Sequence, residues 1–269
     1  MHDAMDDAMH DAEAFLRAPR LAAAGFVHGF STRSGGVSAG PFATQNLGAA
    51  VGDDPHAVAE NHRRIAAAVG YDPGKLYQAS QVHGAAVAVP GAGEDPAEVL
   101  SREADALVAR SPGVAVGVRV ADCVPVLLAD TATGHVAAVH AGWRGIVRGV
   151  IRAALRTLGP REPGAVLAAI GPSIGPCCFE VGDEVAGELG ECAGDGIVLR
   201  RGGARPHVDL WRAVEHQLRG LGVGTVDTLG RCTACETARF YSFRRDGARS
   251  GRMLGVIVAR GAPDQIPTG

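Results

Sequence analysis

Residues 120–160 read VADCVPVLLADTATGHVAAVHAGWRGIVRGVIRAALRTLGP, and this stretch decides the fold that we predict. Runs of β-type apolar residues at 123–128 and 135–139 predict two buried strands. After His140 the chain turns into a helix that ends at Gly159 and Pro160. The apolar face of this helix carries Val147, Ile151, Ala154, Leu155 and Leu158. The stretch is thus a strand, loop and helix unit built on a central sheet.

Further strands and helices are interleaved with this unit along the rest of the chain. A helix is predicted after Asp53 or Asp54, with Pro55 as its first residue and Gly70 as its end. Asp209 is placed to cap a later helix. Strand-type runs lie at 85–89, 106–109, 114–120, 166–170, 240–243 and 253–258. We therefore expect the α/β (α+β) class, with mixed β-sheets flanked by helices.

The chain reads as a single domain, because no internal repeat, linker or low-complexity block divides it. Residues 1–20 are predicted to be a polar N-terminal extension, and residues 21–262 to form the domain. Residues 31–48, STRSGGVSAGPFATQNLG, form a turn-rich loop that is long enough to suggest a function.

The composition argues against several classes of protein. With 26 basic and 29 acidic residues among 269, the net charge of -3 favours neither nucleic acid nor an anionic membrane as a partner. The acidic N-terminus lacks the features of a signal peptide, and no apolar run reaches the roughly 18 residues that a membrane span needs. Six cysteines without an export signal indicate reduced thiols. We expect a cytoplasmic protein whose cysteines bind metal or act as nucleophiles.

Three residues at the ends of apolar strands form the candidate catalytic site: His83 in QVHG, Cys123 in VADC and His140 in AVHAGWRG. Imidazole nitrogen and thiolate sulfur are ligands that zinc prefers, and three protein ligands leave a position open for catalysis. The spacing of the three residues matches no local metal signature, so buried, hydrogen-bonded core residues are the alternative interpretation.

Successive blocks of the sequence resemble the laccase-domain (YfiH-type) family over roughly residues 26–258. These blocks are STRSGGVS, Asn46-Leu47-Gly48, QVHG, ADALV, VADCVPVLLAD, HAGWRG, AIGPSIG with FEVG, and FYSFRRDG with GR. The resemblance implies a YfiH-like fold with Zn²⁺ bound by His83, Cys123 and His140. It also implies a purine nucleoside phosphorylase that cleaves inosine, adenosine and methylthioadenosine and has adenosine deaminase activity. Purine nucleosides and phosphate are then the small-molecule partners, and we expect a monomer.

These activities make different demands on the site. In deamination, a zinc-activated water would attack C6 of the purine. In phosphorolysis, phosphate held by arginines would attack C1 of the sugar while the base departs with a proton.

The predicted substrate-binding residues are Arg33, Asn46, Arg144 and Arg244. Arg144 lies at the junction of loop and helix near His140, where free backbone N–H groups also favour an anion. Each arginine can donate hydrogen bonds to a phosphate or a ribose hydroxyl, or can stabilise a loop instead. Arg148, Arg152 and Arg156 follow at helical spacing and are interpreted as a solvated face.

Other polar residues carry weaker signals. Asp122 beside Cys123 is interpreted as a cap of the neighbouring loop. Cys232 and Cys235 form one CxxC motif, which is weak evidence for zinc or redox chemistry without a second pair. Cys177 and Cys178 have no obvious partner in the sequence.

Three alternative functions remain open. Cys123 could be the nucleophile of a cysteine hydrolase, with His83 or His140 as its base. Copper at the same residues could oxidise phenols. Multicopper laccases, however, use His-x-His pairs, and none of the ten histidines here is two positions from another. A binding protein with structural zinc is the third alternative, but such sites usually have four ligands, and this site has three.

Overall fold

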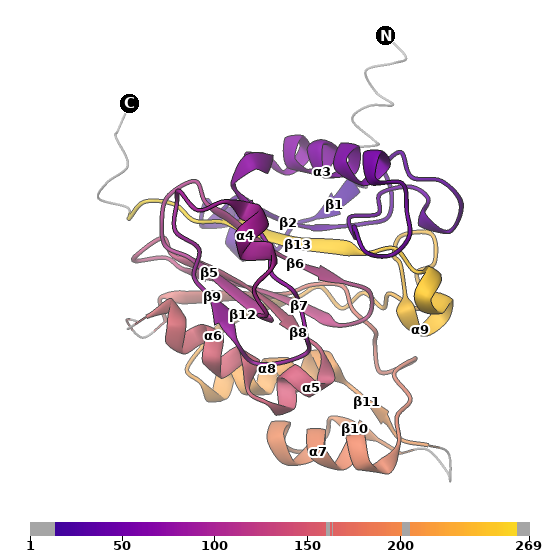
Figure 1. Cartoon of the computed structure of the whole chain (residues 1–269). Coiled ribbons are helices and arrows are strands. Elements are labelled where there is room, and N and C mark those ends of the chain that lie inside the picture. The colour runs from indigo at the N-terminus through magenta and orange to yellow at the C-terminus, as the bar shows by residue number, and fades with distance from the viewer. Residues whose placement is uncertain (1–13, 160–161, 163, 201–204, 263–269) are drawn as a thin grey trace.

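The computed structural model describes residues 14–159, 162, 164–200 and 205–262, and two stacked β-sheets form its centre (Figure 1). One helix covers the outer face of the first sheet, and several helices cover the outer face of the second. The mixed α/β class predicted from the sequence is confirmed.

The first sheet has five strands in the order β1-β2-β13-β6-β3. All neighbours are antiparallel except β3 and β6, which are parallel. The strands are β1 (Phe15–Leu16), β2 (His28–Ser31), β3 (Leu76–Tyr77), β6 (Ala115–Val120) and β13 (Met253–Val258).

The second sheet has six strands in the order β12-β9-β7-β8-β5-β4, with antiparallel pairs at its centre and a parallel pair at each edge. The strands are β4 (Val87–Ala88), β5 (Ala106–Ala109), β7 (Val124–Asp130), β8 (Val136–Ala141), β9 (Val166–Ile170) and β12 (Thr225–Thr228). A separate hairpin consists of β10 (Val198–Leu199) and β11 (His207–Val208).

The helices surround these sheets, and α3 lies on the first while α5, α6 and α8 lie beneath the second (Figure 1). The helices are α2 (Pro19–Ala23), α3 (Pro55–Val69), α4 (Pro96–Leu100), α5 (Trp143–Val147), α6 (Val150–Leu158), α7 (Asp183–Ala193), α8 (Leu210–Gly220) and α9 (Phe243–Asp246). Short 3-10 turns lie at Gly40–Phe42, Pro73–Lys75 and Gly247–Arg249. Among the described residues, no helix is long and apolar enough to cross a membrane.

Strand β7 explains why the core has several layers. All seven of its residues are buried, because each face of the strand packs against a different layer. Val126 and Leu128 join the cluster between the sheet and the helices, whereas Leu127 and Ala129 join the cluster between the two sheets. A third cluster, with Ile65 of α3, covers the first sheet. The apolar run of β7 therefore specifies a strand covered on both sides.

Most of the predicted elements are confirmed, and two differ. Asp54 caps α3, and Gly70 ends it in a left-handed conformation, as predicted. The single helix predicted after His140 is instead two helices, because Gly149 adopts φ 79° between them. The strand predicted at 240–243 is wrong. Periodicity cannot assign so short an apolar run, and its last residue begins α9.

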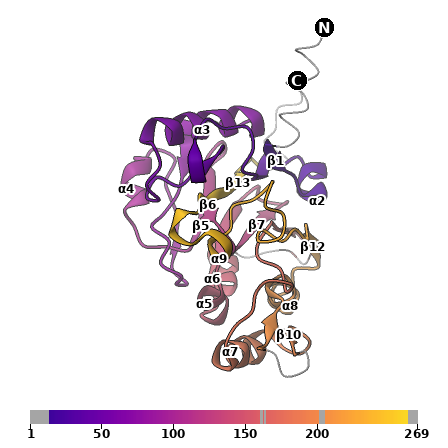
Figure 2. The same cartoon turned by 90° about the vertical axis from the view of Figure 1, so that its right-hand side faces the viewer.

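The folded part of the chain begins earlier than the boundary predicted after residue 20. Phe15 and Leu16 pair with β2, and Ala18 is fully buried in the cluster between the sheets. Residues 14–20 therefore belong to the domain, whereas the first part of the predicted extension lies outside the described residues. Figure 2 views the molecule from the side on which α9 lies in front of the sheets.

Candidate metal centre

Three segments converge where the strands of the second sheet meet their loops. Cys123 immediately precedes β7, and His140 is the penultimate residue of the neighbouring antiparallel strand β8. His83 lies in the loop between β3 and β4. One ligand atom from each of the three residues lies within 4.8 Å of the others. The fold thus brings together the three residues predicted as catalytic and metal-binding.

The side chains of this group face one another closely. The Sγ atom of Cys123 lies 3.8 Å from Nε2 of His83, and the two imidazole rings meet edge to face with centroids 4.9 Å apart. Gly142 of the HAGWRG block packs against this pair. A Cβ atom at Gly142 would lie 2.9 Å from Cδ2 of His83 and 3.1 Å from Sγ of Cys123. Glycine is therefore required here for space rather than for backbone conformation.

A carboxylate that the sequence analysis did not single out, Asp105, organises the group. Asp105 is fully buried, and Nδ1 of His140 donates to its Oδ1 over 2.7 Å. The same carboxylate accepts the backbone N–H groups of Val82, His83 and Gly84. A carboxylate on one nitrogen of a metal-binding histidine fixes the tautomer and directs the other nitrogen to the metal. Asp105 thus orients His140 and clamps the loop that carries His83.

The loops beside the site have strained backbones that specific contacts hold in place. His83 has φ 58° and Asp122 has φ 84°, a region that residues other than glycine rarely occupy. Besides the amide contacts to Asp105, Arg148 donates to the carbonyl of His83 over 2.9 Å. The carboxylate of Asp122 accepts from Thr233, Ser242 and the backbone of Arg244. These bonds give Asp122 the loop-bracing role proposed from the sequence.

Electrostatic interactions favour an ionised sulfur at the site. Burial opposes the charged form of Cys123, but the positive charge of His140 and hydrogen bonds from both histidines outweigh it and lower the pKa of the thiol to about 6. Burial likewise opposes the charge on His140, but the Cys123 thiolate and the Asp105 carboxylate raise its pKa to about 9. A thiolate is the form that binds a metal or attacks as a nucleophile.

The donor set fits a catalytic zinc ion. It consists of two imidazoles and one thiolate, with a carboxylate behind one of the imidazoles. The described residues bring only these two histidines together in such a group, whereas a cluster of several copper ions needs many more.

A cleft of about 640 Å³ opens onto this group. Its walls combine arginines with aromatic and apolar side chains. The arginines are Arg119, Arg144, Arg244 and Arg252. The aromatic and apolar side chains include Trp143, Ile174, Phe179 and Phe243. Such a lining suits a ligand that has an anionic part and a flat, apolar part.

The four predicted substrate-binding residues have different positions. Arg144 and Arg244 line the cleft, and their guanidinium groups lie over the rings of Trp143 and Phe179, at 4.4 and 5.3 Å from the centroids. Arg33 is held away from it, since its side chain donates to the carbonyls of residues 43 and 237. Asn46 is buried behind the wall.

Asn46 contacts the cleft through its neighbours. Its Oδ1 accepts the backbone N–H groups of Gly48 and Arg252, two residues that line the cleft. Its Nδ2 donates to the carbonyl of Gly48 and to Asp53. Asn46 thus fixes the backbone at Arg252.

Arg119 and Arg252 form a positively charged pair that the sequence analysis missed. Burial lowers the pKa of both guanidinium groups, and the charge of Arg252 lowers that of Arg119 further. Within the described part of the chain, neither forms a salt bridge. Two partly buried arginines without an acidic partner favour a bound anion. Arg252 belongs to the GR block that resembles the laccase-domain family, and this block could have identified it as a candidate site residue.

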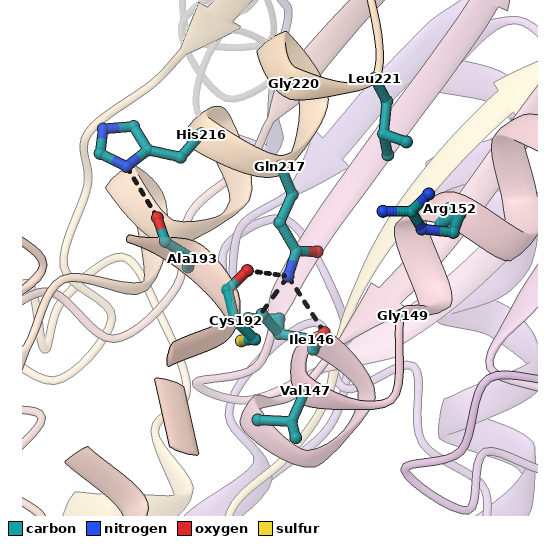
Figure 3. A pocket seen from close by; sticks show the side chains of 10 residues that line it. All are labelled: Ile146, Val147, Gly149, Arg152, Cys192, Ala193, His216, Gln217, Gly220 and Leu221. Carbon is teal, nitrogen blue, oxygen red and sulfur yellow. Dashed lines mark hydrogen bonds between the residues drawn. The ribbon is translucent and has the colours of Figure 1, made fainter. Parts of the chain in front are cut away.

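A second hollow of about 320 Å³ lies among α5, α6, α7 and α8 (Figure 3). The Nε2 atom of Gln217 donates to the carbonyls of Ile146 and Cys192, and Nδ1 of His216 contacts the carbonyl of Ala193. The polar groups of Gln217 and His216 are thus engaged with the protein, and Arg152 is the one arginine among the described residues that line this hollow, whereas four arginines line the cleft.

Comparisons with known proteins find relatives that match most of the chain. Residues 27–260 match the family described as multi-copper polyphenol oxidoreductase laccase. A purine nucleoside phosphorylase of Deinococcus radiodurans is 43% identical over 248 residues, which cover 90% of this chain and 91% of that protein. A purine nucleoside phosphorylase of Pseudomonas aeruginosa is 42% identical over 231 residues, which cover 84% of this chain and 90% of that protein.

The fold is also found in a solved structure. The crystal structure of YlmD from Geobacillus stearothermophilus superposes with a TM-score of 0.84 at 34% sequence identity. The match covers 93% of this chain and 97% of that chain.

Asp105→Asn should weaken metal binding by about 10- to 100-fold, because the amide supports the histidine less strongly than the carboxylate does. Competition with a chelator of known zinc affinity measures this change. Asp95→Asn, which alters a carboxylate that caps the distant helix α4, is the control and should leave the affinity unchanged. An unchanged affinity in Asp105→Asn would contradict the orienting role.

In metal-free protein, alkylation of Cys123 by iodoacetamide should have its midpoint near pH 6 and slow as the pH falls below it, because the thiolate is the reactive form. Mass spectrometry of the labelled peptide measures the rate. Cys192 is the internal control, since burial raises its pKa and its labelling should require more alkaline pH. A midpoint for Cys123 near the ordinary thiol value of about 8.5 would show that the histidines do not stabilise the thiolate.

Proposed function

This chain belongs to the multi-copper polyphenol oxidoreductase laccase family, and we propose that it is a zinc-dependent purine nucleoside phosphorylase with adenosine deaminase activity. The observation that carries the proposal is a cleft in which arginines without a salt-bridge partner among the described residues lie beside the His83, Cys123 and His140 group. The names of the relatives identify purine nucleosides as the substrate class. We propose inosine, adenosine and methylthioadenosine as substrates, in the cytoplasm.

Arg119 and Arg252 are the proposed phosphate site. One side of each guanidinium is occupied by the protein, because Arg119 donates to the carbonyl of Ala79 and Arg252 to the carbonyls of residues 250 and 251. The other donors remain for a ligand, and guanidinium groups bind phosphate oxygens in pairs. These arginines would hold phosphate near C1 of the ribose and offset its negative charge during the attack.

The apolar wall is the proposed site of the purine base. Phe243 lines the cleft and is 52% exposed, so its ring is accessible to a flat ligand. Ile174 and Phe179 lie on the same cleft and are buried, so they offer a fixed apolar surface. Stacking the base between these side chains would align the sugar with the phosphate.

His83, Cys123 and His140 would hold the zinc, and Asp105 would position His140. When bound, zinc supplies Lewis-acid chemistry and activates water, which deamination at purine C6 requires. The protein's own contribution is to exclude bulk water with the apolar wall and to present the purine edge to the metal ligands.

A cysteine hydrolase is the second candidate, because Cys123, His140 and Asp105 form a nucleophile, base and carboxylate series. The position of His83 favours the metal instead, since this second histidine also faces the sulfur. A hydrolase would form a covalent intermediate on Cys123. Copper-dependent phenol oxidation is a further alternative, for which oxidation of a phenol by copper-loaded protein is the test.

Purified protein should convert inosine and phosphate to hypoxanthine and ribose 1-phosphate, and Arg252→Gln should raise the KM for phosphate by about 10- to 100-fold, because one charged hydrogen-bond donor group is lost. Chromatography of the products at varied phosphate concentrations measures both. Arg152→Gln is the matched control, since this arginine lies on the second hollow and is exposed.

Two results would contradict the proposal. The first is the absence of phosphate-dependent hypoxanthine release in zinc-loaded protein. The second is an Arg252→Gln variant whose phosphate KM equals that of Arg152→Gln, which would remove the phosphate site assigned here. Ammonia release from adenosine without phosphate tests the deaminase activity separately.

A further inference from the structure

Four cysteines that lie far apart in the sequence meet beside the cleft. Cys177 and Cys178 lie in the segment that follows β9, and Cys232 and Cys235 lie in the segment that follows β12. Since β9 and β12 are adjacent parallel strands, both segments leave the sheet at the same end, next to each other. Ser173 and Cys232 continue this parallel pairing beyond the strands. The sheet topology therefore brings the two cysteine pairs together.

The four sulfur atoms lie within 4.8 Å of one another. The Sγ atom of Cys235 is 3.3 Å from that of Cys178 and 3.5 Å from that of Cys177. Zinc–sulfur bonds of about 2.3 Å in a tetrahedron separate the sulfurs by about 3.8 Å, which is close to this spacing. A disulfide requires a separation of about 2.05 Å, and all four cysteines are free.

The surroundings of the sulfurs resemble those of bound thiolates. The backbone N–H of Gly175 donates to Sγ of Cys232 over 3.2 Å, and Cys232 is buried. Cys177 and Cys235 are exposed and give an ion access to the group.

We propose that Cys177, Cys178, Cys232 and Cys235 bind a second zinc ion in a closed, four-thiolate site that is structural rather than catalytic. Four ligands leave no open position, unlike the three of the cleft. Soft thiolate ligands select zinc over magnesium or calcium.

The second zinc ion would brace the wall of the cleft. Thr233, next to Cys232, donates to Asp122 over 2.6 Å, and Asp122 precedes the cleft ligand Cys123. Nη1 of Arg244 donates to the carbonyl of Cys178 over 3.2 Å. Phe179, which follows Cys178, lines the cleft. Binding one ion would thus join two segments that each position cleft residues.

Metal analysis of protein purified under reducing conditions with zinc tests the site. The wild type should hold two zinc ions per chain, and the double variant Cys177→Ser with Cys235→Ser should hold one. Cys192→Ser is the matched control and should keep two, because Cys192 lies on α7, outside the group. Cys123→Ala should also hold one ion. In this variant the cleft loses its ion, and the four cysteines keep theirs.

Cobalt substitution in Cys123→Ala tests the same site without altering its four cysteines. The remaining ion should show strong sulfur-to-cobalt charge-transfer bands and the visible bands of tetrahedral cobalt. Either the absence of these bands or an unchanged metal count in the double cysteine variant would overturn the proposal.

Discussion

The buried carboxylate of Asp105 is the interaction on which the site depends. It binds Nδ1 of His140 and three consecutive amides around His83, so one side chain fixes two of the three candidate metal ligands. A fully buried carboxylate is stable only with such partners. Removing any one of them would weaken the compensation of the buried charge, and this mutual dependence holds the QVHG loop and the end of β8 in one arrangement.

The stacked sheets place the other parts of the cleft around this centre. Arg119 lies on strand β6 of the first sheet. Arg252 immediately precedes β13, which pairs with β6, so both arginines come from the same sheet. Strands β7 and β8 of the second sheet bring Cys123 and His140. The cleft therefore lies where the ends of the two sheets and their loops meet, with the proposed phosphate-binding arginines on the side of the first sheet and Cys123 and His140 on the side of the second.

The sequence predicted those features that depend on local patterns. The bounds of α3 follow from Asp54, Pro55 and Gly70, and the buried strands follow from continuous apolar runs. The role of Asp105 was not predictable in this way, because its partners are backbone amides and a histidine on another strand. Arg119 was hidden within an apolar strand. The four-cysteine group depends on the pairing of β9 with β12, a strand of mixed polarity that no periodicity marked. Tertiary contacts, rather than local preference, decide these features.

The central claim is that His83, Cys123 and His140 hold a metal ion at the cleft. X-ray diffraction from crystals of the active protein, recorded above and below the zinc absorption edge, measures this most directly. The account predicts an anomalous peak bounded by these three side chains, with the imidazole of His140 bonded to Asp105. Active crystals that show no peak there, and instead show substrate density joined covalently to Sγ of Cys123, would contradict the account and favour the hydrolase.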